Sequence, residues 1–312
     1  MRTTAKTGFF YSIKRAFTVK IVQTLTAVFL LLLGLLLLFP LYYAFLSSIS
    51  TLGEFNASKF IPLPHNPFGE FITNYKALFA LSSLFRAVLV TLLRIVFSFT
   101  AAAITSVFGG YVFARLNFPG RDKVFLVLLA TTMIPGTALT VSTYLWFADF
   151  PLFGGNNLLG QGGRGLIDNP AFFFVTGWVN VINIFLFRQA FIGLGGELGE
   201  SAKIDGANFM YIVLFIYMPL AAPLLVVLGL GTFIGIWNDY MSNLIFVESN
   251  TRWYGIAYYA VGLSNYFSSH AGGYDYPKAF AILLMMMAPP TILFCFFQNK
   301  FLEGMTTGAI KF

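Results

Sequence analysis

Six long apolar runs, separated by shorter polar or charged segments, make up most of the chain. A helix needs about 20 consecutive apolar residues to cross the hydrocarbon core of a bilayer, and each run has roughly this length. The pattern therefore predicts an all-α, polytopic membrane helix bundle. The six predicted spans are Ile21–Ser47, Leu84–Ala114, Val124–Phe147, Ala171–Phe191, Tyr211–Trp237 and Ala279–Phe297.

Two of these runs contain helix-breaking residues. Pro135-Gly136 lies in the third predicted span and Pro289-Pro290 in the sixth. Membrane helices tolerate such residues because neighbouring groups satisfy the freed backbone, so we expect both spans to be kinked. A basic segment precedes the first span, as in a secretory signal. Its apolar run is too long for a signal core and no A-x-A-like site follows, so we interpret it as a membrane anchor.

Composition agrees with the pattern of spans. The 312 residues are 58% hydrophobic and 10% charged, whereas soluble domains carry about 25% charged residues. Nothing is left for a separate soluble domain. We therefore divide the chain into a cytoplasmic segment 1–20, a transmembrane domain 21–301 and a cytoplasmic tail 302–312.

The distribution of Lys and Arg predicts the orientation. With both termini in the cytoplasm, twelve cations lie on the inner side and five on the outer side, which is a positive-inside bias. The inner set is Arg2, Lys6, Lys14, Arg15, Lys20, Arg115, Arg121, Lys123, Arg188, Lys203, Lys300 and Lys311; the outer set is Lys59, Lys76, Arg164, Arg252 and Lys278. The net charge of +7 therefore reflects membrane orientation and indicates no nucleic-acid partner.

Several kinds of chemistry are missing from the sequence. No G-x-x-x-x-G-K-[ST] motif occurs, so the chain lacks this nucleotide-binding loop. The predicted spans contain no Asp or Glu, which counts against a proton-coupled carrier. Cys295 lies within a span, and His65 and His270 have no clustered ligands, so we predict no disulfide and no metal site. The pattern indicates a conduit that needs an external motor.

A polar segment between the fourth and fifth spans carries four charged side chains in nine residues: Glu197, Glu200, Lys203 and Asp205. Gly195-Gly196 should end the preceding helix, and two acids would then occupy the first turn of a short helix, where the helix dipole favours anions. Gly206 suits the left-handed turn that ends this helix. The segment, within a coupling loop 195–210, is interpreted either as a docking element for a cytoplasmic partner or as a solvated loop.

This segment resembles the E-A-A---G---------I-L-P signature of the membrane subunits of binding-protein-dependent ABC importers. It reads Glu200-Ser-Ala-Lys-Ile-Asp-Gly-Ala207, followed by Ile216-Tyr-Met-Pro219, with Ser201 and Met218 departing from the signature. The resemblance implies a coupling helix that inserts into a cleft of an ATP-hydrolysing subunit. The residues to which it assigns this role are Glu197, Glu200, Ala202, Asp205, Gly206 and Ala207.

Further motifs resemble the carbohydrate-importer branch, typified by the shorter, second maltose-type permease subunit. They are Phe118-Pro-Gly-Arg121, Met133-Ile-Pro-Gly136, Phe187-Arg-Gln-Ala-Phe191, Trp237-Asn-Asp239 and the tail Phe301-Leu-Glu-Gly-Met-Thr-Thr-Gly-Ala-Ile-Lys311. The resemblance implies the type I ABC importer fold in a bacterial cytoplasmic (inner) membrane. The implied partners are a second permease subunit, two ATP-binding subunits and an extracytoplasmic solute-binding protein. This chain would bind no cofactor, with ATP and Mg held by the partner ATPase, and would not itself be an enzyme.

Candidate pathway residues are Arg94, Trp237, Asn238 and Asp239. A cation about ten residues into a span must be paired, hydrated or snorkelling, so Arg94 either faces an anionic substrate or pairs with an acid of the second permease subunit or with backbone carbonyls. The aromatic and polar residues at 237–239 either contact sugar or anchor and cap the helix at the interface.

The long outer loop 238–277 corresponds by position to the loop that meets the binding protein in maltose-type systems. Its candidate contacts are Tyr266, Phe267, His270 and Tyr274. Aromatic and small polar residues suit a mobile recognition loop and equally suit a membrane interface. The outer segment 148–170, rich in Gly and Asn, should be irregular.

Three functions follow from this sequence. The first is an ABC permease for a sugar or oligosaccharide, and the second is an ABC permease for an acidic oligosaccharide or a glycerol phosphodiester. The third is a self-contained ion-coupled carrier or channel. Stable purification without any ATPase would favour the third.

Overall fold

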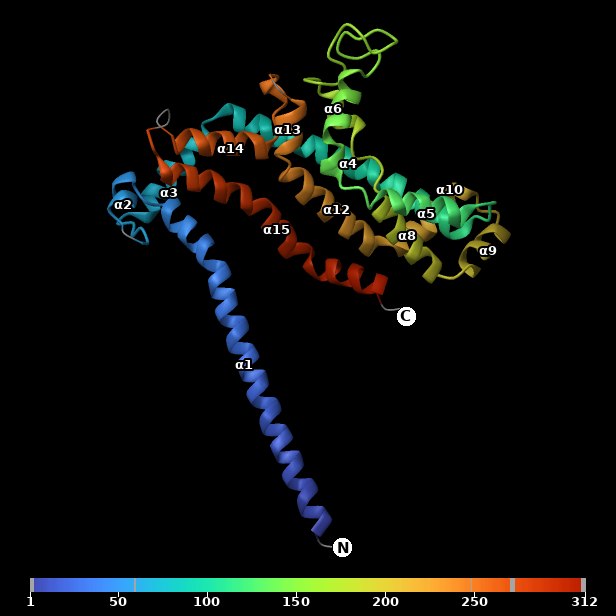
Figure 1. Cartoon of the computed structure of the whole chain (residues 1–312), viewed down its shortest axis with the longest axis horizontal. Coiled ribbons are helices and arrows are strands. Elements are labelled where there is room, and N and C mark those ends of the chain that lie inside the picture. The colour runs from blue at the N-terminus through green and yellow to red at the C-terminus, as the bar shows by residue number, and fades with distance from the viewer. Residues whose placement is uncertain (1–2, 59, 248, 270–272, 310–312) are drawn as a thin grey trace. The chain divides into compact units, whose positions relative to one another are not determined.

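The computed structural model describes the backbone of residues 3–58, 60–247, 249–269 and 273–309, with side chains from residue 19 to residue 300 in these ranges. All regular elements in this part of the chain are helical, which confirms the all-α prediction. In chain order they are α1 (Thr3–Ser48), α2 (Leu52–Ala57), α3 (Pro67–Phe79), α4 (Ser82–Arg115), α5 (Arg121–Thr131), the 3-10 helix η1 (Gly136–Leu139), α6 (Thr140–Ala148), α7 (Ala171–Val175), α8 (Val181–Gly193), α9 (Glu197–Ile204), α10 (Phe209–Tyr211), the π-helix η2 (Ile212–Tyr217), α11 (Met218–Leu220), α12 (Ala222–Trp237), α13 (Met241–Phe246), the 3-10 helix η3 (Thr251–Trp253), α14 (Ile256–Phe267) and α15 (Tyr276–Ala309) (Figure 1).

Three unbroken helical stretches are long and apolar enough to cross a membrane: Val19–Ser48 in α1, all of α4, and Tyr276–Lys300 in α15. They contain the predicted first, second and sixth spans, which are therefore confirmed as helices. α15 continues as one helix through Pro289 and Pro290.

The third and fifth predicted spans are bent pairs of helices. Arg121–Thr131 meets Gly136–Ala148 at 82°, next to Pro135, as the sequence predicted. Phe209–Leu220 meets Ala222–Trp237 at 79°, a bend that we did not predict. Pro219 and Pro223 flank this second bend, and each lacks the N–H that would continue the helical hydrogen bonding.

The fourth predicted span, Ala171–Phe191, is wrong as one continuous helix. α7 ends at Val175 and α8 begins at Val181, with Gly177 at φ +83° between them. α8 has 13 residues, a length of roughly 20 Å at 1.5 Å per residue. A window of apolar composition does not reveal that its backbone leaves the helical conformation.

The chain divides into two compact units, residues 1–76 with 267–284, and residues 77–266 with 285–312. In the first unit, a polar cluster joins the end of α1 to α3. The Asn74 side-chain amide donates to the carbonyl oxygens of Ser48 at 3.0 Å and Ser50 at 3.3 Å. The membrane-length window of α1 is not buried within the chain.

Glu54 holds the short helix α2 at its start. Its carboxylate accepts the backbone N–H groups of Thr51 and His65, both at 2.8 Å, and completes a capping box with the Thr51 side chain. These two backbone hydrogen bonds are the largest influences that lower the pKa of Glu54 to about 2. The charged form of Glu54 therefore stabilises this connection.

In the second unit, α4 packs along α8 and α12 (Figure 1). The contact between α4 and α8 is close because Gly110 has no side chain. A Cβ at Gly110 would lie 2.5 Å from the Phe187 Cβ and 3.0 Å from the Arg188 backbone nitrogen. The core beside this contact includes Tyr111, Phe191 and Tyr217.

The two longer predicted outer segments differ in structure; the first and residues 238–266 of the second belong to this unit. Residues 149–170 form turns and bends with no helix, as predicted. The described part of residues 238–277, which we predicted as a long loop, is largely helical in α13, η3 and α14. The Tyr, Ser and Gly content led to the loop prediction, whereas the apolar residues between them pack against the domain and stabilise helices. One such residue is Ile256, which is 1% exposed.

Replacing Gly110 with Ala should destabilise the α4–α8 contact by about 1–3 kcal/mol, the usual cost of overpacking a filled core. We expect a lower melting temperature in detergent, measured by fluorescence-detected size exclusion after heating. Gly231→Ala in α12 is the matched control, because a Cβ at Gly231 would have no neighbouring atom within 4 Å. It should preserve or slightly raise the melting temperature, and equal effects of the two changes would contradict the close-contact interpretation.

Candidate coupling and pathway sites

The polar segment between α8 and α9 forms a separate short helix. α9 covers Glu197–Ile204, with Glu197 and Glu200 in its first turn and Lys203 in its last turn. This arrangement complements the helix dipole at both ends. The side chains of Glu197, Glu200 and Lys203 are exposed, and Ile204 is 87% exposed. α9 therefore presents a charged edge and an apolar residue to its surroundings.

The opposite face of α9 is fixed to the core. Ala202 is 8% exposed and belongs to the buried cluster around Tyr111 and Tyr217. Gly199 is also buried, and a Cβ there would lie 3.2 Å from the Tyr217 hydroxyl oxygen. The small residues Gly199 and Ala202 thus let α9 lie close to η2. Movement of α9 would act directly on the packed helices.

A tight turn ends α9. Gly206 has φ +83°, the left-handed conformation that glycine adopts without strain. The N–H of Ala207 donates to the Ala202 carbonyl at 2.9 Å. The Asn208 side chain then caps α10 by accepting the Tyr211 N–H at 2.8 Å. The predicted turn at Gly206 is confirmed.

A cavity of about 460 Å³ lies beside this turn. Its lining residues are Ala202, Asp205, Gly206, Ala207, Asn208, Tyr211 and Ile216. The sequence-predicted residues Ala202, Asp205, Gly206 and Ala207 therefore share one concave surface. Glu197 and Glu200 lie on the exposed helix that leads to it.

Two of the predicted pathway residues contact each other. The Arg94 guanidinium donates to the Asp239 carboxylate, and the two side chains are 11% and 17% exposed. The Arg94 guanidinium carbon also lies 4.6 Å from the centre of the Phe173 ring. Of the alternatives for Arg94, pairing with an acid is what the structure shows, and the acid belongs to the same chain.

A polar network that we did not predict surrounds this pair. Thr91, one turn before Arg94 in α4, accepts the Ile256 N–H at 2.8 Å. Asn243 is fully buried, donates to the Asp239 carbonyl at 3.1 Å and accepts the Gly255 N–H at 2.8 Å. Polar residues within apolar runs were the available signal. The partner of Thr91 lies 165 residues away in the sequence and so was not predictable.

Trp237 packs in the core of this unit. It is 4% exposed, its indole N–H donates to the Met286 carbonyl at 2.9 Å, and its ring stacks on Phe233 at 5.4 Å. Its ring faces are therefore not presented as a stacking surface for a sugar. Asn238 is exposed, and its side-chain amide donates to the Ile234 carbonyl at 3.0 Å.

The candidate contacts for a binding protein lie on and after α14. Tyr266 is 49% exposed near the end of this helix, and Tyr274 is 38% exposed with φ +57°. The Phe267 ring centre lies 5.9 Å from the Lys278 ammonium nitrogen. His270 lies outside the described residues. These four residues remain candidates.

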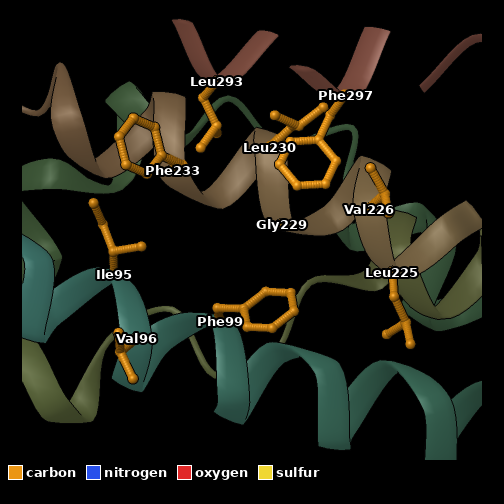
Figure 2. A pocket seen from close by; sticks show the side chains of 10 residues that line it. All are labelled: Ile95, Val96, Phe99, Leu225, Val226, Gly229, Leu230, Phe233, Leu293 and Phe297. Atoms are coloured by element: carbon orange, nitrogen blue, oxygen red, sulfur yellow. The ribbon is translucent and has the colours of Figure 1, made fainter. Parts of the chain in front are cut away.

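An apolar groove runs between α4, α12 and α15 and has a volume of about 390 Å³ (Figure 2). Figure 2 shows Phe99 from α4 on one side of the groove, with Leu230 and Phe233 from α12 and Leu293 and Phe297 from α15 on the other side. The lining side chains carry no hydrogen-bonding group, whereas a sugar needs such groups for orientation and specificity. This groove is therefore not the sugar site.

Asp168 organises the outer segments and was also missed. Its carboxylate accepts the backbone N–H groups of Ser249 at 2.8 Å and Asn250 at 3.1 Å, the Ser249 hydroxyl, and the Arg164 guanidinium at 3.1 Å. Partial burial by itself raises the pKa of Asp168. The hydrogen bonds from Ser249 and Asn250 and the charge of Arg164 outweigh burial and hold the pKa below its usual value.

No family model matches the chain. It is 23% identical over 292 residues to the polygalacturonan/rhamnogalacturonan transport system permease protein YtcP of Bacillus subtilis, covering 91% of this chain and 96% of the relative. It is 30% identical over 202 residues to the arabinooligosaccharides permease protein AraQ of Halalkalibacterium halodurans, covering 65% of each. It is 26% identical over 280 residues to the sn-glycerol-3-phosphate permease protein UgpE of Escherichia coli, covering 88% of this chain and 93% of the relative.

The fold matches a solved structure. A chain of a bacterial ABC transporter involved in the import of the acidic polysaccharide alginate superposes with a TM-score of 0.73 at 21% sequence identity. The match covers 90% of this chain and 96% of that chain. The expected fold class, a polytopic helical membrane bundle of the ABC importer type, is confirmed.

Replacing Asp239 with Asn should leave the Arg94 charge buried without its counter-ion. Removing one partner of a buried ion pair costs about 3–5 kcal/mol, so we expect a marked fall in melting temperature in detergent. Asn retains an oxygen that can accept the Ser242 N–H, so loss of that cap does not explain the effect.

Arg94→Met combined with Asp239→Asn is the matched control for this pair. The double variant removes both charges and should recover most of the lost stability, because no unpaired charge remains. If the two single changes are additive in a double-mutant cycle, the ion pair does not stabilise this unit.

Replacing Asp168 with Ala should loosen the attachment of residues 249–250, because hydrogen bonds to a charged group contribute about 1.5–3 kcal/mol each. We expect faster hydrogen exchange at these residues and unchanged exchange in α12. Since folding lowers the pKa, the stabilisation by Asp168 is present above its ordinary value of 3.8 and is lost as the pH falls through the lower folded value. Exchange that is insensitive to the substitution would contradict this role.

Proposed function

We propose, from the premise that this chain is a homologue of the permease proteins of carbohydrate ABC importers, that it forms half of an importer's translocation pathway. The other half is a second, homologous permease subunit. An extracytoplasmic binding protein delivers the solute, and two ATPase subunits supply the energy. The location is the bacterial cytoplasmic membrane, with α9 on its inner side.

The observation that carries this proposal is the dual character of α9. One face carries exposed Glu197 and Glu200, while Gly199 and Ala202 on the other face are buried against the core. An element of this kind receives force from a partner on its charged edge and passes it to the helices beneath. Glu200 is the residue that we expect to pair with a basic group of the ATPase, an interaction strengthened by partial desolvation.

The mechanism is a population shift between two packings of the same helices. ATP binding would draw the two ATPase subunits together and move α9 with them. The core residues behind α9, Tyr111 and Tyr217, then transmit the displacement to α4 and η2. The loaded binding protein and ATP each bias the bundle toward the outward-open packing by binding it more tightly. The bond-breaking chemistry is ATP hydrolysis, which takes place in the partner subunits.

A neutral sugar or oligosaccharide is the substrate class that we favour. The reason is the pairing of Arg94 with Asp239, which neutralises the cation that would otherwise attract an anionic solute. Import of an acidic oligosaccharide or a glycerol phosphodiester is the second candidate, supported by the names of the relatives YtcP and UgpE. It would require Arg94 to exchange Asp239 for the substrate.

The substrate class is tested by uptake in the source organism after deletion of this gene. Cells lacking the chain should lose uptake of labelled neutral oligosaccharides, tested with arabinotriose and diacetylchitobiose, and regain it on complementation. The same cells should take up digalacturonate and glycerol 3-phosphate at the parental rate. Loss of uptake of only the two anionic compounds would overturn the assignment to a neutral sugar.

Replacing Glu200 with Lys should abolish coupling while the chain still folds, because juxtaposed like charges at an interface cost several kcal/mol. With an affinity tag on this chain, the wild type should co-purify with an ATPase, and the variant should lose that partner or its activity. We expect uptake to fall roughly tenfold or more. Asp149→Lys, the same charge reversal at an exposed outer position, is the control and should keep both.

Two outcomes would contradict the proposal. A wild-type chain that purifies without an ATPase and transports alone would be a self-contained carrier. A Glu200→Lys variant with normal uptake would show that this carboxylate has no part in coupling.

A further inference from the structure

The corner between α8 and α9 has little to hold its angle. The two helices meet at 76° across residues 194–196. Gly195 has φ +78°, and Gly196, the N-cap of α9, offers no side-chain cap. Glycines are conformationally permissive, and from the backbone the last carbonyl groups of α8 accept only the N–H groups of Leu194 and Gly195, at 3.2–3.5 Å. Side chains from elsewhere can therefore help to fix the angle of the corner.

Arg115 adds side-chain hydrogen bonds to this corner. Its Nη2 group donates hydrogen bonds to the carbonyl oxygens of Phe191, in α8, and Gly195, in the link. Its Nε–H is buried and has no acceptor among the described residues. The two hydrogen bonds from Nη2 therefore attach Arg115 to the corner. A cation at the carboxyl end of a helix is also favoured by the helix dipole.

Tyr217 completes this contact from the other side. Its hydroxyl donates to the same Gly195 carbonyl at 3.3 Å, and its ring centre lies 5.5 Å from the Arg115 guanidinium carbon. Tyr217 is fully buried in η2, directly behind Gly199 of α9. Arg115 therefore ties together the end of α4, the corner and the π-helix that follows α9.

Because Arg115 lies at the end of α4, its contact with the corner is connected to the other end of this helix. α4 is an unbroken helix from Ser82 to Arg115. It also carries Thr91 and Arg94, which bind Ile256 and Asp239 in the outer part of the unit. Arg94 and Arg115 are 21 residues apart in this helix, a distance of roughly 30 Å at 1.5 Å per residue. One rigid helix thus joins the inner corner to the outer polar network.

We propose that Arg115 is a positioning residue that fixes the orientation of α9 on α4, so that a displacement of α9 reaches the outer residues 239–256. This inference rests on the proposed function, because it assumes that an ATPase acts on α9. Arg115 then has a second role besides its contribution, as an inner cation, to the orientation of the chain in the membrane. Lysine cannot replace it fully, since an ammonium lacks the planar guanidinium that lies over the Tyr217 ring while Nη2 binds the two carbonyl groups.

Spin labels on the two arms of the corner test the geometry. Cysteines at Ile182 and Ser201, both exposed, are introduced after Cys295→Ser, which removes the native thiol. Distances are measured in the complex purified through a tag on this chain. We expect a narrow distribution in the wild type and in Arg121→Gln, a control at a partly exposed arginine whose hydrogen bonds go to residues outside the α8–α9 corner. Arg115→Gln should broaden the distribution, and Arg115→Lys should give an intermediate width.

Coupling is measured in parallel with the same variants. For Arg115→Gln we expect the ATPase to co-purify and to hydrolyse MgATP at a rate close to that of the wild type. Uptake of labelled arabinotriose or diacetylchitobiose, whichever the wild type imports, should fall about tenfold relative to hydrolysis, a typical size for a lost coupling energy. A purely structural defect would lower complex yield, hydrolysis and uptake together, which would overturn the positioning role.

The two proposals fail in different ways. If no ATPase co-purifies with the wild type, the proposed function is wrong. If the ATPase does co-purify but Arg115→Gln keeps a narrow distance distribution and the wild-type ratio of uptake to hydrolysis, only the role of Arg115 is wrong.

Discussion

Lipid cannot hydrogen-bond to a peptide group, so any backbone that leaves the helical conformation at membrane depth needs a partner from the protein. The second unit contains several points where the backbone leaves the helical conformation, and α4 supplies hydrogen-bond partners at three of them. Thr91 accepts the Ile256 N–H, Thr105 donates to the Trp178 carbonyl in the link between α7 and α8, and Arg115 donates to the carbonyls at the α8–α9 corner. The start of α14, the α7–α8 link and the α8–α9 corner are therefore all attached to this one continuous helix.

Close approach of the helices makes these contacts reachable. At Gly110 the α8 backbone lies directly against α4, with no room for a Cβ. Side chains as short as threonine can then reach from α4 to neighbouring backbone groups. A longer separation would leave the same carbonyl and N–H groups unsatisfied, at a cost of several kcal/mol each in a nonpolar environment. Tight packing and backbone satisfaction are therefore the same constraint.

Charge in this chain is placed where it acts. The acids of α9 remain exposed, while Arg94 and Asp239 are paired and mostly buried. The exposed acids are available to a partner, and the buried pair attaches residues 239–256 to α4 without leaving a net charge. Buried ion pairs add little stability compared with apolar packing but tolerate no unpaired member. This property suits a contact that specifies one arrangement of the outer segment.

The local features of the chain followed from its sequence. Apolar runs of membrane length predicted the first, second and sixth spans, which are single helices. Pro135-Gly136 predicted the break in the third span. Glycines at 195 and 206 with the acids between them predicted the bounds of α9 and its left-handed turn. The E-A-A-like segment predicted a resemblance to the membrane subunits of ABC importers, and the relatives found are transport system permease proteins. Each of these signals depends on residues close together in the chain, where helical period, backbone conformation and dipole act directly.

The long-range contacts were decided by the tertiary structure. Arg94 and Asp239 are 145 residues apart in sequence, and composition alone could not tell a substrate-facing cation from a paired one. The sequence offered Trp237 as a stacking surface for a sugar, whereas in the structure its indole N–H donates to the Met286 carbonyl and the side chain is buried. The role of Arg115 at the α8–α9 corner likewise depends on which helices touch. Partner choice is set by the packing of whole helices, and no local pattern encodes the distance between two of them.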